Sequence, residues 1–314
     1  MSAPSRYAKP PLTFDQQAQL LLARGLIAPS AAAIREKLQA VSYYRLSAYW
    51  HPFKQPDETL KPGTTLDMVW RRYVFDRQLR LLVMDAIERV EIAVRTGMVE
   101  QFTNQYGAFG YRDVARLPGL HAGERADFLE EIQANTERSR EEFVRHYKAK
   151  YPLNVDTDGV AILPLWMAAE VMSFGTLFTL YRGLEFCMKK EVARGFGVMA
   201  PVFESWLNTL NYVRNLCAHH ARLWNRELAI KPRFPERKFA PGWHVPTPIS
   251  NLRIFAVLTL LQFLLKRVAP QSRWPARLRA LLAEYPDVPL RYMGFPEHWE
   301  KTVFWSDGTA ESKG

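Results

Sequence analysis

Cysteine is scarce in this sequence of 314 residues, which contains only Cys187 and Cys217. A disulfide framework or a cysteine-rich zinc site is therefore not predicted. The amino-terminal sequence MSAPSRYAKPPLTFDQQAQ lacks the apolar segment of a signal peptide. The most apolar run, Ile254–Leu265, is shorter than the roughly 20 residues that span a bilayer and contains Gln262. We therefore expect a cytoplasmic protein that does not insert into a membrane, with this run as a buried core helix.

Alternating apolar and polar residues, the pattern of β-strands, are also missing, and no segment repeats. Apolar residues instead recur at helical spacing, which predicts an all-α protein. We expect an N-terminal helical subdomain over residues 1–62, a core over 63–235, and a C-terminal helical extension over 236–314 that packs on the core. The predicted helices cover residues 13–24, 30–41, 66–102, 124–150, 163–184, 206–223, 249–268 and 273–284.

Acidic residues are in the minority: 42 Lys and Arg stand against 32 Asp and Glu, a net charge of +10. Such an excess favours a polyanionic partner, either nucleic acid or an anionic membrane surface. A basic soluble protein without such a partner is the alternative. Hydrophobic residues make up 48% of the chain, so it can bury a core and is not a disordered chain.

Polar side chains gather on one face of the predicted 206–223 helix, around the sequence RNLCAHH. Cys217 and His219 fall on opposite faces at 100° per residue, so a metal site is disfavoured. His220 falls among the apolar residues, which predicts a core or interface histidine that supports the motif. The polar arc holds Asn208, Asn211, Arg214, Asn215, His219 and Arg222.

An arginine and a histidine on one polar face suit chemistry on a phosphodiester. The imidazole of His219 can act as general base or acid, and the guanidinium of Arg214 can stabilise charge on phosphate oxygens. Asn215 can orient either group. Attack by the 2′-hydroxyl of RNA needs no metal and no cofactor. Because Arg214 and His219 lie roughly 140° apart on one helix, we expect a homodimer with a shared cleft and Trp206 and Tyr212 among its contacts.

A second polar stripe, Glu88, Glu91 and Arg95, crosses the predicted 66–102 helix. Buried polar groups must be paired to be tolerated. The stripe is then either an ion-pair network that holds helices together or a device that positions Arg214. Glu170, the lone acid of its apolar helix, is a candidate partner on the same terms.

A basic, proline-rich segment follows the motif, with Trp224 and Phe234 between its cations. In single-stranded RNA recognition, cations contact phosphates and aromatic rings stack on bases. The segment is therefore either an RNA-binding surface or a solvated loop. Its cations are Arg226, Lys231, Arg233, Arg237 and Lys238.

Several sequence blocks resemble, in family order and over residues 7–299, the AbiD/AbiF-like abortive infection family. They are YAKPPLTFDQQAQLLLARGL, LQAVSYYRLSAYWHPF, VFDRQLRLLVMDAIERVEIAVR, LPLWMAAEVMSFGTLFTLY, YVRNLCAHHARLWNR and YMGFPEHW. Within them, RNLCAH fits the R-x4-6-H motif of HEPN-domain ribonucleases. The resemblance implies a HEPN-like helical bundle, an anti-phage or toxin–antitoxin role, and metal-independent RNA cleavage that leaves 2′,3′-cyclic phosphate ends.

Carried over from the motif, the catalytic pair is Arg214 and His219, with Asn215 as support. The resemblance also implies a small non-coding RNA as a bound regulator. Some HEPN proteins only bind RNA or another protein, so a non-catalytic RNA-binding protein is the alternative.

Overall fold

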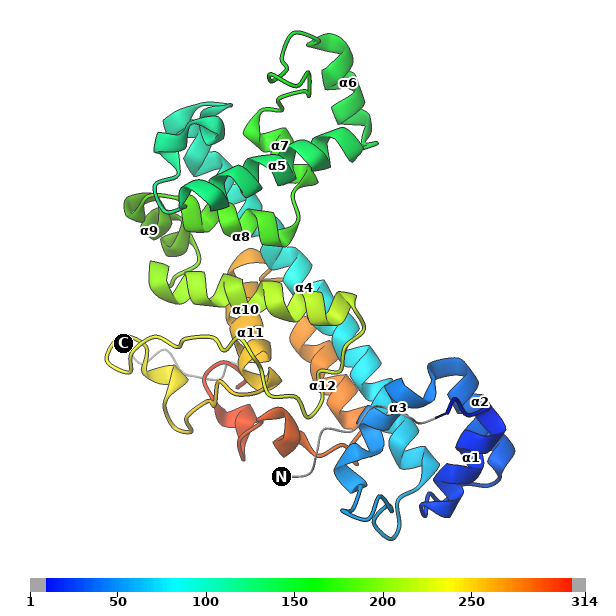
Figure 1. Cartoon of the computed structure of the whole chain (residues 1–314). Coiled ribbons are helices and arrows are strands. Elements are labelled where there is room, and N and C mark those ends of the chain that lie inside the picture. The colour runs from blue at the N-terminus through cyan, green and yellow to red at the C-terminus, as the bar shows by residue number, and fades with distance from the viewer. Residues whose placement is uncertain (1–9, 307–314) are drawn as a thin grey trace, which may run out of the picture. The chain divides into compact units, whose positions relative to one another are not determined.

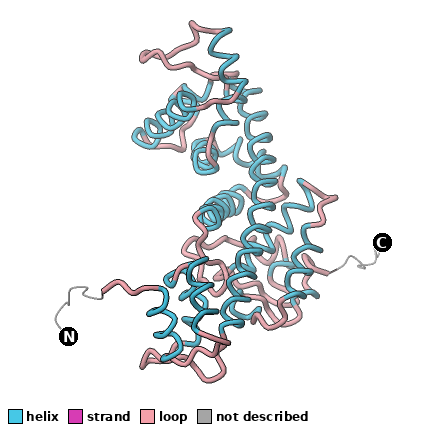
Figure 2. The backbone as a smooth tube through the Cα atoms, turned by 90° about the vertical axis from the view of Figure 1, so that its right-hand side faces the viewer, coloured by secondary structure: helices cyan, strands magenta, loops and turns pink. Residues whose placement is uncertain are grey.

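The computed structural model describes residues 10–306. Over this range the chain forms twelve α-helices joined by loops and short 3-10 turns, and its only β pairings are isolated bridges (Figure 2). The all-α prediction is therefore confirmed. Residues 10–306 form two compact units: residues 10–79 with Ala280–Val288, and Arg80–Arg279 with residues 289–306. The three-part division stays a prediction, because these units are defined by proximity and not by independent folding.

In the first unit, helices α1 (Phe14–Ala23) and α2 (Ala31–Val41) begin at capping side chains that the sequence supplies. The hydroxyl of Thr13 accepts a hydrogen bond from the Gln16 N–H, and that of Ser30 accepts one from the Ala33 N–H. Gly25 adopts a positive φ of 91° just after α1, as expected for a glycine that ends a helix. Helix α3 (Tyr43–Trp50) completes this group.

Helix α4 (Leu66–Tyr106) is the longest helix of the described chain and contributes residues to both units. Within the second unit its buried side chains recur every three or four residues, the spacing that keeps one face of a helix against a core. These residues are Val83, Ile87, Val90, Val94 and Met98.

Two predicted helices are each divided in the structure. The predicted 124–150 helix is α5 (Ala122–Arg138) and α6 (Glu142–Lys150), separated by extended backbone at Ser139 and Glu141. The predicted 163–184 helix is α7 (Leu165–Val171) and α8 (Phe174–Gly183). Its break is local in origin, because the hydroxyl of Ser173 accepts a hydrogen bond from the Thr176 N–H and so begins α8.

The core of the second unit lies around α10 (Ala200–Ala218), which contacts α8, α9 (Phe186–Gly195) and α11 (Ile254–Val268) (Figure 1). Helix α11 is buried along nearly its whole length, so the prediction of a core helix is confirmed. None of the helices within residues 10–306 combines the length and apolar character needed to span a bilayer. The last long helix is α12 (Trp274–Glu284).

Candidate functional site

Helix α10 ends at Ala218, so the predicted helix over 206–223 is wrong beyond this point. The Ala221 N–H donates to the Leu216 carbonyl at 2.8 Å, and the His220 N–H donates to the Cys217 carbonyl at 3.0 Å. These two bonds form a Schellman motif, which requires a left-handed residue just past the helix. His220 fills that position with a φ of 56°, where glycine is the usual residue.

Both histidines of the motif are exposed at this helix end. His219 is the C-terminal capping residue of α10, and its imidazole lies at the surface, as predicted. His220 is also exposed, so the core alternative of its prediction is wrong, and the interface alternative stays a prediction. The error has a simple cause: the helical projection continued past Ala218, where the backbone changes direction.

Arg214 is half-buried and lines a pocket of about 580 Å³ beside helix α4. The rest of the lining comes from α4 and includes Glu88, Glu91 and Arg95, the stripe predicted on the long helix. Burial raises the pKa of the Glu91 carboxyl above its usual value, while the positive charges of Arg95 and Arg214 act in the opposite direction. The α4 stripe and the motif arginine therefore share one electrostatic environment.

The stripe itself is only partly buried. Glu91 and Arg95 form an ion pair of 2.8 Å with side chains 15% and 12% exposed, whereas Glu88 is exposed. The ion pair itself lies within one turn of α4. Arg95 also donates to the Met172 carbonyl at 3.4 Å, at the break between α7 and α8. Glu170 is exposed on α7, which contradicts the buried pairing predicted for it.

The polar arc predicted along α10 is not one groove. Asn208 lines a separate pocket with Ser205 and Arg233, and the side chain of Asn211 lies beside Gly175 of α8. Asn215 is exposed near the end of the helix. Arg222, which lies beyond the helix, donates from Nη2 to the Asn225 carbonyl at 3.4 Å.

A turn rich in arginine follows the motif and is fixed by a distant residue. The Nε of Arg226 donates to the Arg222 carbonyl at 2.6 Å. Arg253, which precedes α11, donates from Nη1 to the Asn225 side-chain oxygen and to the Tyr292 carbonyl, both at 3.1 Å. The sequence pattern does not predict this role of Arg253, because no local spacing indicates bonds across such separations.

In the basic segment, Lys231, Arg233, Arg237 and Lys238 are exposed, and Arg226 is half-buried. Lys231 pairs with Glu227 at 2.8 Å, and Lys238 pairs with Glu236 at 3.0 Å. The interaction with Lys231 holds the pKa of the Glu227 carboxyl below its usual value. Four of the five predicted cations are therefore at the surface, two of them already paired with a carboxylate.

Of the two aromatic residues predicted to stack on bases, Trp224 lies in the core, which contradicts that prediction, and Phe234 is half-buried. Trp224 is fully buried, and Phe234 stacks on Trp243 with ring centroids 4.8 Å apart. Trp206 is also fully buried, so it cannot be the dimer contact that was predicted. Tyr212 is half-buried, and its hydroxyl accepts a hydrogen bond from the Ala229 N–H at 3.4 Å.

The fold and the site together define an all-α protein that presents an arginine–histidine motif at an exposed helix end. The sequence model of the Abi-like protein family matches residues 36–225, more than half of the chain. The protein therefore belongs to this family of abortive infection proteins. The match extends from α2 to the turn after the motif. No curated protein and no solved structure matches the chain.

Proposed function

We propose that this protein is a metal-independent endoribonuclease of the HEPN type that acts in abortive infection. The observation that carries the proposal is the accessibility of His219, which caps α10 at the surface, with Arg214 on the preceding turns of the same helix. Membership of the Abi-like family and the R-x4-H spacing support the same activity. The net charge of +10 suits a polyanionic substrate.

In the proposed reaction, the imidazole of His219 removes the proton from a ribose 2′-hydroxyl. The 2′-oxygen attacks the adjacent phosphorus, and the bond from phosphorus to the 5′-oxygen breaks. A proton returns to the leaving 5′-oxygen, so the products carry a 2′,3′-cyclic phosphate and a 5′-hydroxyl. Arg214 stabilises the additional negative charge on the phosphoryl oxygens in the transition state.

Glu91 is the residue we expect to position Arg214. Its carboxylate is half-buried in the pocket that Arg214 lines, and the two charges attract each other there. Arg95 competes for the same carboxylate through its ion pair of 2.8 Å. The attraction of the Glu91 carboxylate restricts the orientation of the Arg214 guanidinium, which lowers the entropy that Arg214 loses when it binds phosphate.

The geometry also supports a site built from two chains. Arg214 faces the α4 pocket, whereas His219 lies at the end of α10. Two copies related by a two-fold axis would bring the arginine of one chain towards the histidine of its partner. The pocket is bordered by Leu81 and Ile92, which are 59% and 50% exposed and offer an apolar contact surface beside Arg214. An active protein that stays monomeric by light scattering at the assay concentration would contradict this arrangement.

The cleavage proposal is tested with purified protein and structured RNA in excess EDTA. Replacing His219 with alanine should reduce the cleavage rate by about 10²–10⁴-fold, the usual contribution of a general acid–base group. His146→Ala is the matched control, because His146 is an exposed histidine on α6 outside the site. Equal rates for the wild type and His219→Ala would remove His219 from the mechanism.

The second candidate function is RNA binding without cleavage, which the exposed cations Lys231, Arg233, Arg237 and Lys238 favour. The same assay separates the two functions. A gel shift that weakens with salt, without cleavage by the wild type, would support the binding function.

A further inference from the structure

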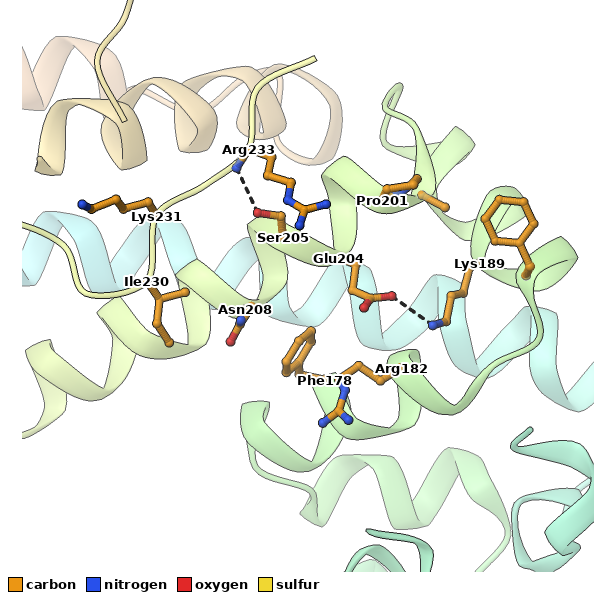
Figure 3. Close-up of a pocket in the computed structure, with 12 residues that line it drawn as sticks. Phe178, Arg182, Lys189, Pro201, Glu204, Ser205, Asn208, Ile230, Lys231 and Arg233 are labelled. Carbon is orange, nitrogen blue, oxygen red and sulfur yellow. Dashed lines mark hydrogen bonds and ion pairs between the residues drawn. The ribbon is translucent and has the colours of Figure 1, made fainter. Parts of the chain in front are cut away.

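The second compact unit, which contains α10, has another pocket with a volume of about 590 Å³. This pocket lies beside the amino-terminal half of α10. Its wall is formed by α8, the first turns of α9 and α10, and the loop of residues 230–233 (Figure 3). This volume is within the range of about 300–1,000 Å³ that small-molecule pockets occupy. Of the motif arc only Asn208 reaches the pocket, so it is distinct from the pocket of Arg214.

The lining carries four cations and one carboxylate, and three of the cations already have acidic partners. Lys189 pairs with Glu204 inside the pocket at 2.9 Å (Figure 3). Arg182 pairs with Glu124, which lowers the pKa of that carboxyl, and Lys231 pairs with Glu227.

Arg233 differs from these three cations. Its guanidinium has no ion-pair or hydrogen-bond partner among residues 10–306, whereas its main chain is held on both sides. The Arg233 N–H donates to the Ser205 hydroxyl at 2.9 Å (Figure 3). The Arg233 carbonyl accepts from the Trp206 indole N–H at 2.7 Å. Trp206 is fully buried, so this anchor is part of the core. The chain thus fixes the backbone of an arginine whose charged group remains able to bind an anion.

The remaining wall suits an aromatic group next to that anion. Phe178 and Phe186 line the pocket, and Phe186 is 61% exposed. Lys190 places its ammonium 5.5 Å from the centroid of the Phe186 ring, which adds positive charge at this edge. Asn208 supplies an amide that can donate and accept hydrogen bonds at the edge of a base. A guanidinium, an exposed phenyl ring and an amide in one pocket match the phosphate, base and base edge of a nucleotide.

We propose that this pocket binds one nucleotide unit, with its phosphate on Arg233 and its base against Phe186. The unit is either a free nucleotide or one residue of a single-stranded RNA, since both present the same groups. The binding requires no cleavage, so it stands whether or not the proposed ribonuclease activity does.

The test uses the full-length protein with His219 replaced by alanine, so that cleavage does not disturb a binding measurement. Calorimetric titrations with adenosine 5′-monophosphate and with a six-nucleotide oligoadenylate report on the two sources. Arg233→Gln should weaken binding of at least one probe about tenfold or more, the usual value of a charged hydrogen bond. Glutamine keeps the main-chain bonds to Ser205 and Trp206, so the fold is preserved.

Phe186→Leu keeps an apolar side chain but removes the ring face, and should weaken the same probe at least about fivefold. Arg194→Gln is the charge-matched control, because Arg194 lies on α9 outside the pocket and pairs with Glu191. If Arg233→Gln weakens binding of the monophosphate, the ligand of the pocket is a free nucleotide. If Arg233→Gln weakens binding of the oligoadenylate alone, the ligand is one residue of an RNA strand. Unchanged affinity of both probes for Arg233→Gln, or the same weakening for Arg194→Gln, would overturn the proposal. Inorganic phosphate that binds as tightly as the monophosphate, with no effect of Phe186→Leu, would overturn it as well.

Discussion

Replacing His220 with glycine should stabilise the protein, although it removes a side chain from the motif region. His220 is held at a φ of 56° by the two hydrogen bonds that close α10. The left-handed conformation costs an L-residue about 1–2 kcal/mol, and glycine avoids this cost. Glycine loses about 0.5–1 kcal/mol more conformational entropy on folding, which offsets part of the gain. The expected net stabilisation is about 0.5–1 kcal/mol.

Thermal unfolding followed by circular dichroism measures this effect. A gain of about 0.5–1 kcal/mol corresponds to a rise in Tm of about 1–4 °C for a unit of this size. His220→Ala keeps the β-carbon and the strain, so it should not share the gain. His146→Gly is the opposite control, because His146 lies inside α6, where glycine should lower Tm. A lower Tm for His220→Gly than for the wild type would refute the argument from backbone strain.

The remaining predictions concern the core anchor, the α4 pocket and the basic segment. Trp206→Phe removes the donor to the Arg233 carbonyl and part of a fully buried ring. The free energy of unfolding should therefore fall by about 2–4 kcal/mol. An unchanged midpoint of urea unfolding would contradict this prediction. The folded-state pKa of Glu91 is raised from 4.5, so its contribution to stability is lost as pH rises through the folded pKa. Glu91→Gln should therefore gain in Tm relative to the wild type as the pH rises from 4.5 towards neutrality, and a relative fall over this range would show that the sign is wrong. Neutralising Lys231, Arg233 and Arg237 together should weaken the salt dependence of single-stranded RNA binding. The slope of the logarithm of the binding constant against the logarithm of the salt concentration should fall by about 0.7 for each phosphate that is no longer bound. An unchanged slope would indicate that the segment is a solvated loop.

Most helices could be predicted, because their apolar residues recur at helical spacing and their capping residues are local. Thr13, Ser30 and Gly25 mark the limits of α1 and α2 in the sequence itself. The sequence pattern does not predict the division between α7 and α8, because the apolar spacing continues through it, although Ser173 is a usable signal. The end of α10 carried no such signal, since a histidine occupies the position where glycine is usual.

In the candidate site, the sequence predicts only those features that arise from the residue spacing within a single helix. The pattern along α4 predicts the stripe with Glu91 and Arg95, and a role in positioning Arg214 is one of its two interpretations; the structure places the stripe in the pocket that Arg214 lines. The anchoring of Arg233 by Trp206 and the role of Arg253 at the turn were not found. These interactions join segments that are distant in sequence, and no helical or strand period indicates them.

The most direct test of the proposed function is the chemistry of the ends that the protein produces. Ribose RNA and the same sequence with 2′-O-methyl groups throughout are incubated with the wild type and His219→Ala in EDTA, and the products are analysed by mass spectrometry. We expect cleavage of the ribose RNA only, by the wild type only, with 2′,3′-cyclic phosphate and 5′-hydroxyl ends. Cleavage of the methylated RNA, or products with 3′-hydroxyl ends, would contradict the proposed mechanism.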